Sequence, residues 1–184
     1  MKDNQHIVTA FDDDLSELNI SLQNLGKMAI TQFELSIDAL ATQHQNTLDK
    51  IIKDDVNLDD LEAAIHEKAF EIIAVRSPLA QDLRHVLVAL KIATILERTG
   101  DYARNIANRT KVIATAGNEN IPGVNIGRMG QVTRDMLQDV MRAYATRDAD
   151  KALDVWRRDI EVDHMHTAFY KEVLASMSRD SNVV

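Results

Sequence analysis

Apolar residues recur at steps of three and four along almost the whole chain, which is the spacing of one buried face of an α-helix. No stretch alternates with the period of two that a half-buried strand shows. The pattern predicts five helices separated by short breaks, with one clear linker after the third helix. The expected helices cover about residues 7–40, from 46 to past 73, 78–114, from the linker to 144, and 150–177, and the linker covers residues 116–123.

The third predicted helix has a face that changes from apolar to acidic. Its residues follow one another at steps of four and three, in the order Leu83, Leu87, Leu90, Thr94, Glu97 and Asp101. The leucines predict that this face enters the core. Carboxylates on a core face are unfavourable unless a cation meets them. We therefore expect a metal ion or a basic side chain beside Glu97 and Asp101.

The second predicted helix has an acidic face of its own. Asp55, Asp59 and Glu62 project within roughly 60° of one another at about 100° per residue, beside an apolar stripe. Neither acidic face has a stripe of Lys or Arg matched to it. Two acidic faces in one bundle predict a metal site lined by carboxylates. The competing interpretation is a solvated surface on which the acids pair with Arg98 or Arg104.

The second half of the chain repeats the first at a shift of 104 positions. Residues 26–80 overlay residues 130–184 without a gap, and the shift matches Asp55 with Asp159 and Asp59 with Asp163. At the position that matches Glu62 the second repeat has His166. The repeat predicts an all-α tandem of three-helix bundles, over residues 1–116 and 117–184. Asp159, Asp163 and His166 are the matching candidate ligands.

The second bundle is expected to be incomplete. Counterparts of the third helix and its two carboxylates would fall beyond Val184, so only helices four and five belong to it. One apolar face of this half then lacks a partner, and we expect another copy of the chain to cover it or the half to be poorly ordered. The face comprises Leu137, Val140, Met141, Val155, Trp156, Val162 and Phe169.

Composition narrows the class of protein. The 184 residues contain only six Gly and two Pro, which favours long helices, and no Cys, which excludes disulfides and thiolate metal sites. A net charge of −8 argues against a nucleic-acid surface. Neither a signal peptide nor a membrane span is expected, which fits a cytoplasmic protein.

Two motifs resemble a known family. Residues 76–84 read R-S-P-L-A-Q-D-L-R, and residues 96–101 read L-E-R-T-G-D and are followed by N-I-A at 105–107. Together they resemble the PhoU-type phosphate-signalling regulators, and the resemblance covers essentially the whole chain. It implies two three-helix repeats, a cytoplasmic homodimer, and metal bound by acidic motifs on each bundle. It also implies negative regulation of phosphate uptake and phosphate-starvation signalling, between a phosphate ABC transporter ATPase and a sensor histidine kinase.

Oxygen ligands with an occasional imidazole suit Mg²⁺, Mn²⁺ or iron, with Ca²⁺ a further candidate. No catalytic constellation is present in the sequence, so the chain is interpreted as a metal-binding adapter and not an enzyme. Two alternatives stay open. A ferritin-like di-metal oxidoreductase needs two Glu-x-x-His pairs, of which Glu161 and His164 form one. A helical adapter without metal is the other.

The break between the second and third predicted helices contains residues that are typical of a helix start. Ser77 and Pro78 predict an N-cap and a first helical residue. Asp82 is expected to pair with Arg84 or Arg76 and so to fix this turn.

Overall fold

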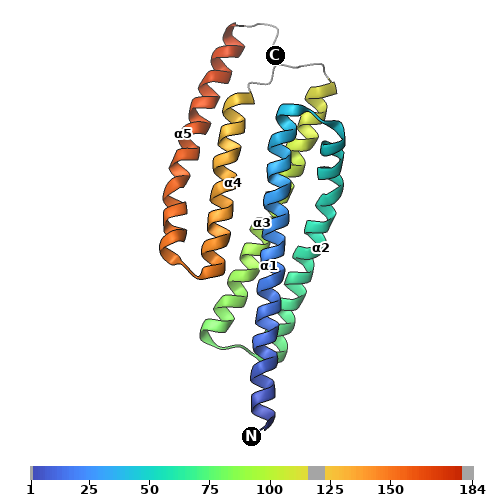
Figure 1. Cartoon of the computed structure of the whole chain (residues 1–184), viewed down its shortest axis with the longest axis vertical. Coiled ribbons are helices and arrows are strands. Elements are labelled where there is room, and N and C mark those ends of the chain that lie inside the picture. The colour runs from blue at the N-terminus through green and yellow to red at the C-terminus, as the bar shows by residue number, and fades with distance from the viewer. Residues whose placement is uncertain (1, 116–122, 180–184) are drawn as a thin grey trace.

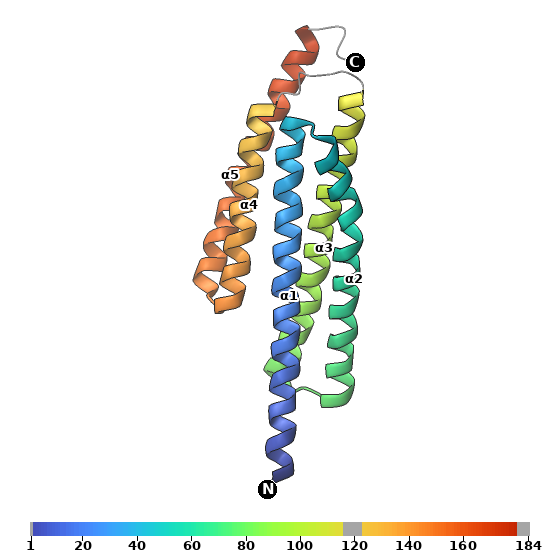
Figure 2. The same ribbon diagram turned by 45° about the vertical axis from the view of Figure 1, so that its right-hand side comes forward.

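The computed structural model describes residues 2–115 and 123–179, with side chains over residues 10–115 and 126–175. Within these ranges it contains five α-helices and no strand. The first three form an up-down-up bundle, and the last two form an antiparallel pair beside α1 (Figures 1 and 2). This confirms the all-α tandem with two helices in the second repeat. The helices are α1 (Lys2–Thr42), α2 (Gln45–Arg76), α3 (Ala80–Thr115), α4 (Gly123–Thr146) and α5 (Ala149–Arg179).

The core of the first bundle combines large residues on two helices with small residues on the third. Leu18, Leu22 and Leu25 of α1 and Leu58 and Ile65 of α2 are fully or almost fully buried. The residues that α3 buries are mostly small, so its backbone can lie close to both neighbours. They are Val86, Ala89, Ala93, Leu96, Gly100, Ala103, Ala107 and Thr110.

The predicted core face of α3 was wrong. Leu87 is 50% exposed and Thr94 is also exposed. The buried face lies about 100° away, on the side of Ala89 and Ala93. A close approach of helices requires small side chains at the contact, and this places the leucine stripe at the edge of the α2–α3 interface. Glu97 and Asp101 therefore lie at this edge and are only partly buried.

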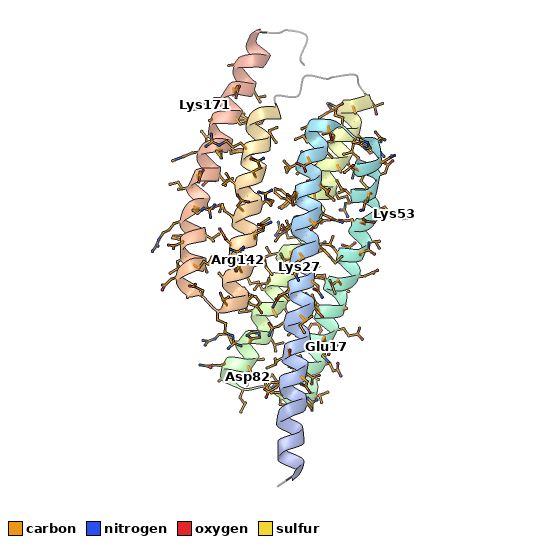
Figure 3. All side chains as sticks on the ribbon, in the orientation of Figure 1. Glu17, Lys27, Lys53, Asp82, Arg142 and Lys171 are labelled. Carbon is orange, nitrogen blue, oxygen red and sulfur yellow. The ribbon has the colours of Figure 1, made fainter. Side chains whose placement is uncertain are left out.

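The turn after α2 also differs from the prediction. Ser77 is the C-cap of α2 and not the N-cap of α3. It has a left-handed backbone conformation (φ 45°), and its N–H donates to the carbonyl of Ile73 at 3.2 Å. Such a residue ends a helix by satisfying a carbonyl of the last turn. Arg76 pairs with Asp14 of α1, at 2.9 Å, and Asp82 is exposed at the start of α3 (Figure 3).

The two repeats contact each other through α1 and α4, which run antiparallel and form a near-symmetrical interface. A Cβ atom at Gly26 would lie 2.7 Å from Met141, and a Cβ atom at Gly130 would lie 2.7 Å from Ile37. Gly26 matches Gly130 under the 104-residue shift, and Ile37 matches Met141 under the same shift. Each repeat thus supplies one glycine and one large residue, and the two contacts are related by a pseudo-twofold axis.

No helix in the described ranges is both long enough and apolar enough to cross a membrane. The predicted boundary near residue 116 falls in residues 116–122, outside the described part, between the ends of α3 and α4.

Candidate metal centre on helices α2 and α3

The structure brings the five first-repeat carboxylates of the prediction to one edge of the bundle. Asp55, Asp59 and Glu62 come from α2, and Glu97 and Asp101 come from α3. Burial raises the pKa of Glu97, and the negative charges of the other four acids raise it further. Glu97 therefore lies within electrostatic reach of all of them. These five residues are called the acidic cluster below.

Arg104 neutralises one end of the acidic cluster. Its guanidinium donates through Nη1 to Oδ2 of Asp55 and through Nη2 to Oδ1 of Asp101, the latter at 2.6 Å. Asp55 is 4% exposed. Burial raises the pKa of Asp55, and the hydrogen bond and charge of Arg104 offset only part of this effect. Arg104 thus meets the requirement for a cation and joins α2 to α3. Arg98, the other proposed partner, donates instead to the hydroxyl of Tyr102 at 3.3 Å.

A small polar network closes the other end of the acidic cluster. Oε1 of Glu62 accepts a hydrogen bond from Oγ1 of Thr94 at 3.1 Å and lies 3.1 Å from Nε2 of His66. Between these two ends, Asp59 and Glu97 have neither a hydrogen-bond nor an ion-pair partner in the described part of the chain. The centre of the cluster therefore carries uncompensated negative charge.

The side chains do not form a finished coordination site. Across residues 10–115 and 126–175, no three Asp, Glu or His groups converge on a point suited to an ion. The chemistry of the donors nevertheless fits a hard divalent cation, since all five are carboxylates with one imidazole at the edge. Arg104 lies where a cation would also be attracted. A metal ion here would require the carboxylates to turn towards one another, and it would compete with Arg104 for Asp55 and Asp101.

The candidate ligands of the second repeat are not assembled. Asp159, Asp163 and His166 are exposed along α5, which in the described ranges packs only against α4. Glu161 and His164, the pair weighed for a di-metal oxidoreductase, are exposed on the same helix. The structure therefore groups the first-repeat residues and leaves the second-repeat residues open.

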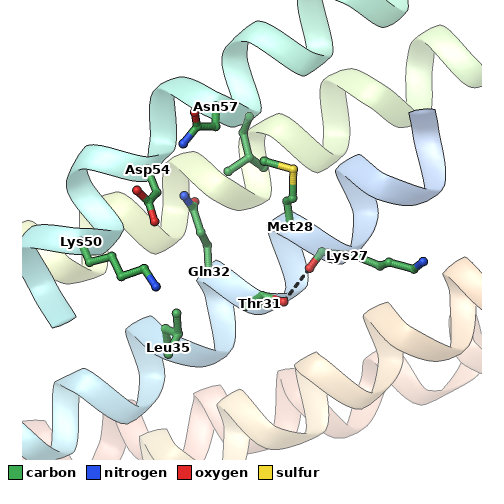
Figure 4. Close-up of a pocket in the computed structure, with 9 residues that line it drawn as sticks. Lys27, Met28, Thr31, Gln32, Leu35, Lys50, Asp54 and Asn57 are labelled. Atoms are coloured by element: carbon green, nitrogen blue, oxygen red, sulfur yellow. Dashed lines mark hydrogen bonds between the residues drawn. The ribbon is translucent and has the colours of Figure 1, made fainter. Parts of the chain in front are cut away.

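A separate hollow lies between α1 and α2 and encloses about 270 Å³. Lys50 and Asp54 reach into it from α2, opposite Gln32 and Thr31 of α1 (Figure 4). Its charged lining comprises two lysines and one carboxylate, which does not suit a cation. Oε1 of Gln32 is buried without a hydrogen-bond donor among the described residues. The hollow includes no member of the acidic cluster.

Comparison with known proteins identifies the family to which these motifs belong. The PhoU domain matches residues 22–110 and 126–184, which is most of the chain and both of its repeats. The chain belongs to the PhoU family. The PhoU-type resemblance of the two motifs is thereby confirmed.

Relatives of this PhoU-family chain match it almost from end to end. It is 36% identical over 180 residues to the phosphate-specific transport system accessory protein PhoU homolog of Caulobacter vibrioides, covering 98% of this chain and 78% of the relative. It is 32% identical over 181 residues to the accessory protein PhoU of Escherichia coli, covering 98% and 75% of the two chains.

Solved PhoU structures share the fold. The crystal structure of PhoU from Pseudomonas aeruginosa superposes with a TM-score of 0.89 at 27% identity, covering 93% of this chain and 82% of that one. The phosphate transport system regulatory protein PhoU from Streptococcus pneumoniae superposes with a TM-score of 0.85 at 26% identity, covering 92% and 80%. The fold of this chain is thus the helical bundle of the solved PhoU structures.

Proposed function

We propose that this chain is a non-enzymatic cytoplasmic adapter that restrains phosphate uptake and phosphate-starvation signalling. The observation that carries the proposal is the match along 98% of the chain to relatives named as accessory proteins of phosphate-specific transport. Its proposed partners are the ATPase of a phosphate ABC transporter and a sensor histidine kinase. An adapter acts by occupying surfaces, and a long bundle with charged exposed faces is suited to that role.

We propose in addition that the acidic cluster binds a divalent cation, with Mg²⁺ and Mn²⁺ the leading candidates and iron and Ca²⁺ the others. Asp59, Glu62, Glu97 and Asp101 would hold it, and Asp55 could join them after leaving Arg104. The support is electrostatic: burial and, after it, the like charges around Glu97 raise its pKa, and a cation would relieve the repulsion between those charges. A bound ion would supply charge neutralisation and hold α2 and α3 in one arrangement.

The second-repeat residues Asp159, Asp163 and His166 are proposed to complete a site only when α5 gains a partner. Trp156 is 73% exposed and Ile160 is 61% exposed on this helix. Apolar side chains of this size rarely stay in water over a continuous stripe. We therefore propose a homodimer in which a second copy covers α5, and analytical ultracentrifugation would test it. A monomer across the micromolar range would contradict the dimer.

The adapter role can be tested by complementation in Escherichia coli lacking its own PhoU. The chain is expected to restore repression of a phosphate-starvation reporter in high phosphate and to lower phosphate uptake. In a strain that also lacks the sensor kinase, the effect on the reporter should disappear while the effect on uptake persists. Expression of folded protein with no change in reporter or uptake would contradict the proposal.

A further inference from the structure

The outer face of α3 has a straight stripe of basic and apolar side chains. At about 100° per residue these side chains fall within an arc of about 80°, on the side opposite the buried alanines. The stripe extends about 38 Å at 1.5 Å per residue. Ile95 is 50% exposed and Tyr102 is 56% exposed, so the stripe is open to solvent. The α3 stripe comprises Arg84, Val88, Lys91, Ile95, Arg98, Tyr102 and Arg109.

The four cations of the α3 stripe have no internal counter-charge. Elsewhere in the bundle Lys68, Arg76 and Arg104 each contact a carboxylate within 3 Å. Within the described ranges no Asp or Glu lies within ion-pair distance of any basic residue of the stripe. A stripe of unpaired cations is unusual on a chain with a net charge of −8. It favours an acidic partner at this face.

The spacing within the α3 stripe indicates the shape of that partner. Val88, Ile95 and Tyr102 are seven residues apart. The cations Arg84, Lys91 and Arg98 are also seven apart and lie between the apolar residues. These are the a and d positions of a heptad, the seam along which one helix packs against another. A complementary helix would place apolar residues on the first series and carboxylates on the second.

We propose that the α3 stripe docks an acidic amphipathic helix of a protein partner. The stripe is one helix wide, so a single facing helix can cover it. An anionic membrane would extend beyond it on both sides. The acidic cluster lies past one edge, with Glu97 and Asp101 about 120° round the helix. These carboxylates and the overall negative charge would oppose a flat anionic surface. The proposal is independent of metal binding by the acidic cluster.

The test uses charge reversal with a matched control. Lys91→Glu with Arg98→Glu alters the α3 stripe, and Lys50→Glu with Lys53→Glu makes the same charge change on exposed positions of α2. Figure 3 labels Lys53 on that helix. The probe is a synthetic helical peptide with Leu at every a position and Glu at every d position. Fluorescence anisotropy should show binding to the wild type that weakens with salt, and a loss of at least about tenfold in the stripe variant only.

A second peptide with Lys at every d position distinguishes a loss of charge complementarity from misfolding of the stripe variant. It should bind the stripe variant more tightly than the wild type, because the charges are then complementary again. Equal binding of the Glu peptide to the wild type and both variants would overturn the proposal. So would sedimentation with phosphatidylglycerol vesicles that depends on the stripe while the Glu peptide does not bind. The phosphate reporter is measured separately, so failure of the adapter role is distinguishable.

Discussion

Adding one methyl group at Gly130 should loosen the contact between the two repeats. A Cβ atom there would lie 2.7 Å from Cγ2, 2.8 Å from Cγ1 and 3.0 Å from Cδ1 of Ile37. Because Ile37 is branched at its own Cβ, its γ carbons are stiff and cannot move away without a poor rotamer or a shift of α1. Gly130→Ala must therefore separate α1 from α4 or strain Ile37.

The magnitude follows from two opposing effects. Overpacking of a close contact costs about 1–3 kcal/mol. Replacing glycine by alanine inside a helix returns about 0.8–1 kcal/mol. The net expected loss for Gly130→Ala is therefore about 0–2 kcal/mol of unfolding free energy. At Gly26 the blocking atom is the terminal methyl of Met141, which is flexible, so Gly26→Ala should be near neutral.

Gly127 supplies the control, because no atom of the described residues lies within 4 Å of a Cβ atom at that position. Gly127→Ala should raise stability by about 0.5–1 kcal/mol. Denaturant unfolding followed by circular dichroism, with hydrogen exchange on α4, should rank the variants Gly127→Ala, Gly26→Ala and Gly130→Ala from most to least stable. Combining Gly130→Ala with Ile37→Ala should restore slow exchange in α4. A Gly130→Ala protein as stable as Gly127→Ala would refute this reasoning.

Three further predictions follow from polar contacts. Asp14→Ala should lower the unfolding free energy by about 1–3 kcal/mol, because Arg76 loses its carboxylate partner and Lys68 keeps only Glu17 and the more distant Glu71. Asp82→Ala, at an exposed position, should change the unfolding free energy by no more than about 0.5 kcal/mol in the same denaturation assay. The ring of His85 on α3 lies 6.2 Å from the ring of Tyr144 on α4, and burial lowers the pKa of His85. The stability that the neutral imidazole contributes is therefore complete above pH about 6.5 and falls as the pH drops below that value. Hydrogen exchange in α4 should follow this trend and lose it in His85→Gln. Arg104→Met should lower the melting temperature without metal and enlarge its rise on adding Mn²⁺, and an unchanged rise would contradict competition between Arg104 and metal.

The helices could be predicted from the sequence, and the face that α3 buries could not. Apolar spacing gave α2 and α5 to within a few residues, since their periodic runs are long. On α3 the leucines formed the more obvious stripe, but Ala89, Ala93 and Gly100 face the core. Hydrophobicity alone ranks leucine above alanine, while the close approach of three helices favours the small residues. That preference depends on the neighbouring helices and is invisible in a single helix.

The candidate site, like the fold, could be predicted from the sequence only in part. Helical spacing was enough to group Asp55 with Asp59 on one helix and Glu97 with Asp101 on the other, and the structure places both pairs at one edge. The contact of Arg104 with Asp101 follows from its spacing of three residues. Its simultaneous contact with Asp55 depends on the register of α2 against α3, which no local pattern encodes.

Calorimetric titration with Mn²⁺ tests the proposed metal centre most directly. The comparison is between the wild type, Glu97→Gln with Asp101→Asn, and Asp12→Asn with Asp13→Asn, which removes the same charge from exposed positions on α1. Binding should persist in the α1 variant, together with the rise in melting temperature that binding produces. Both should vanish in the Glu97 and Asp101 variant. Equal Mn²⁺ binding by all three proteins would contradict a metal centre at the acidic cluster.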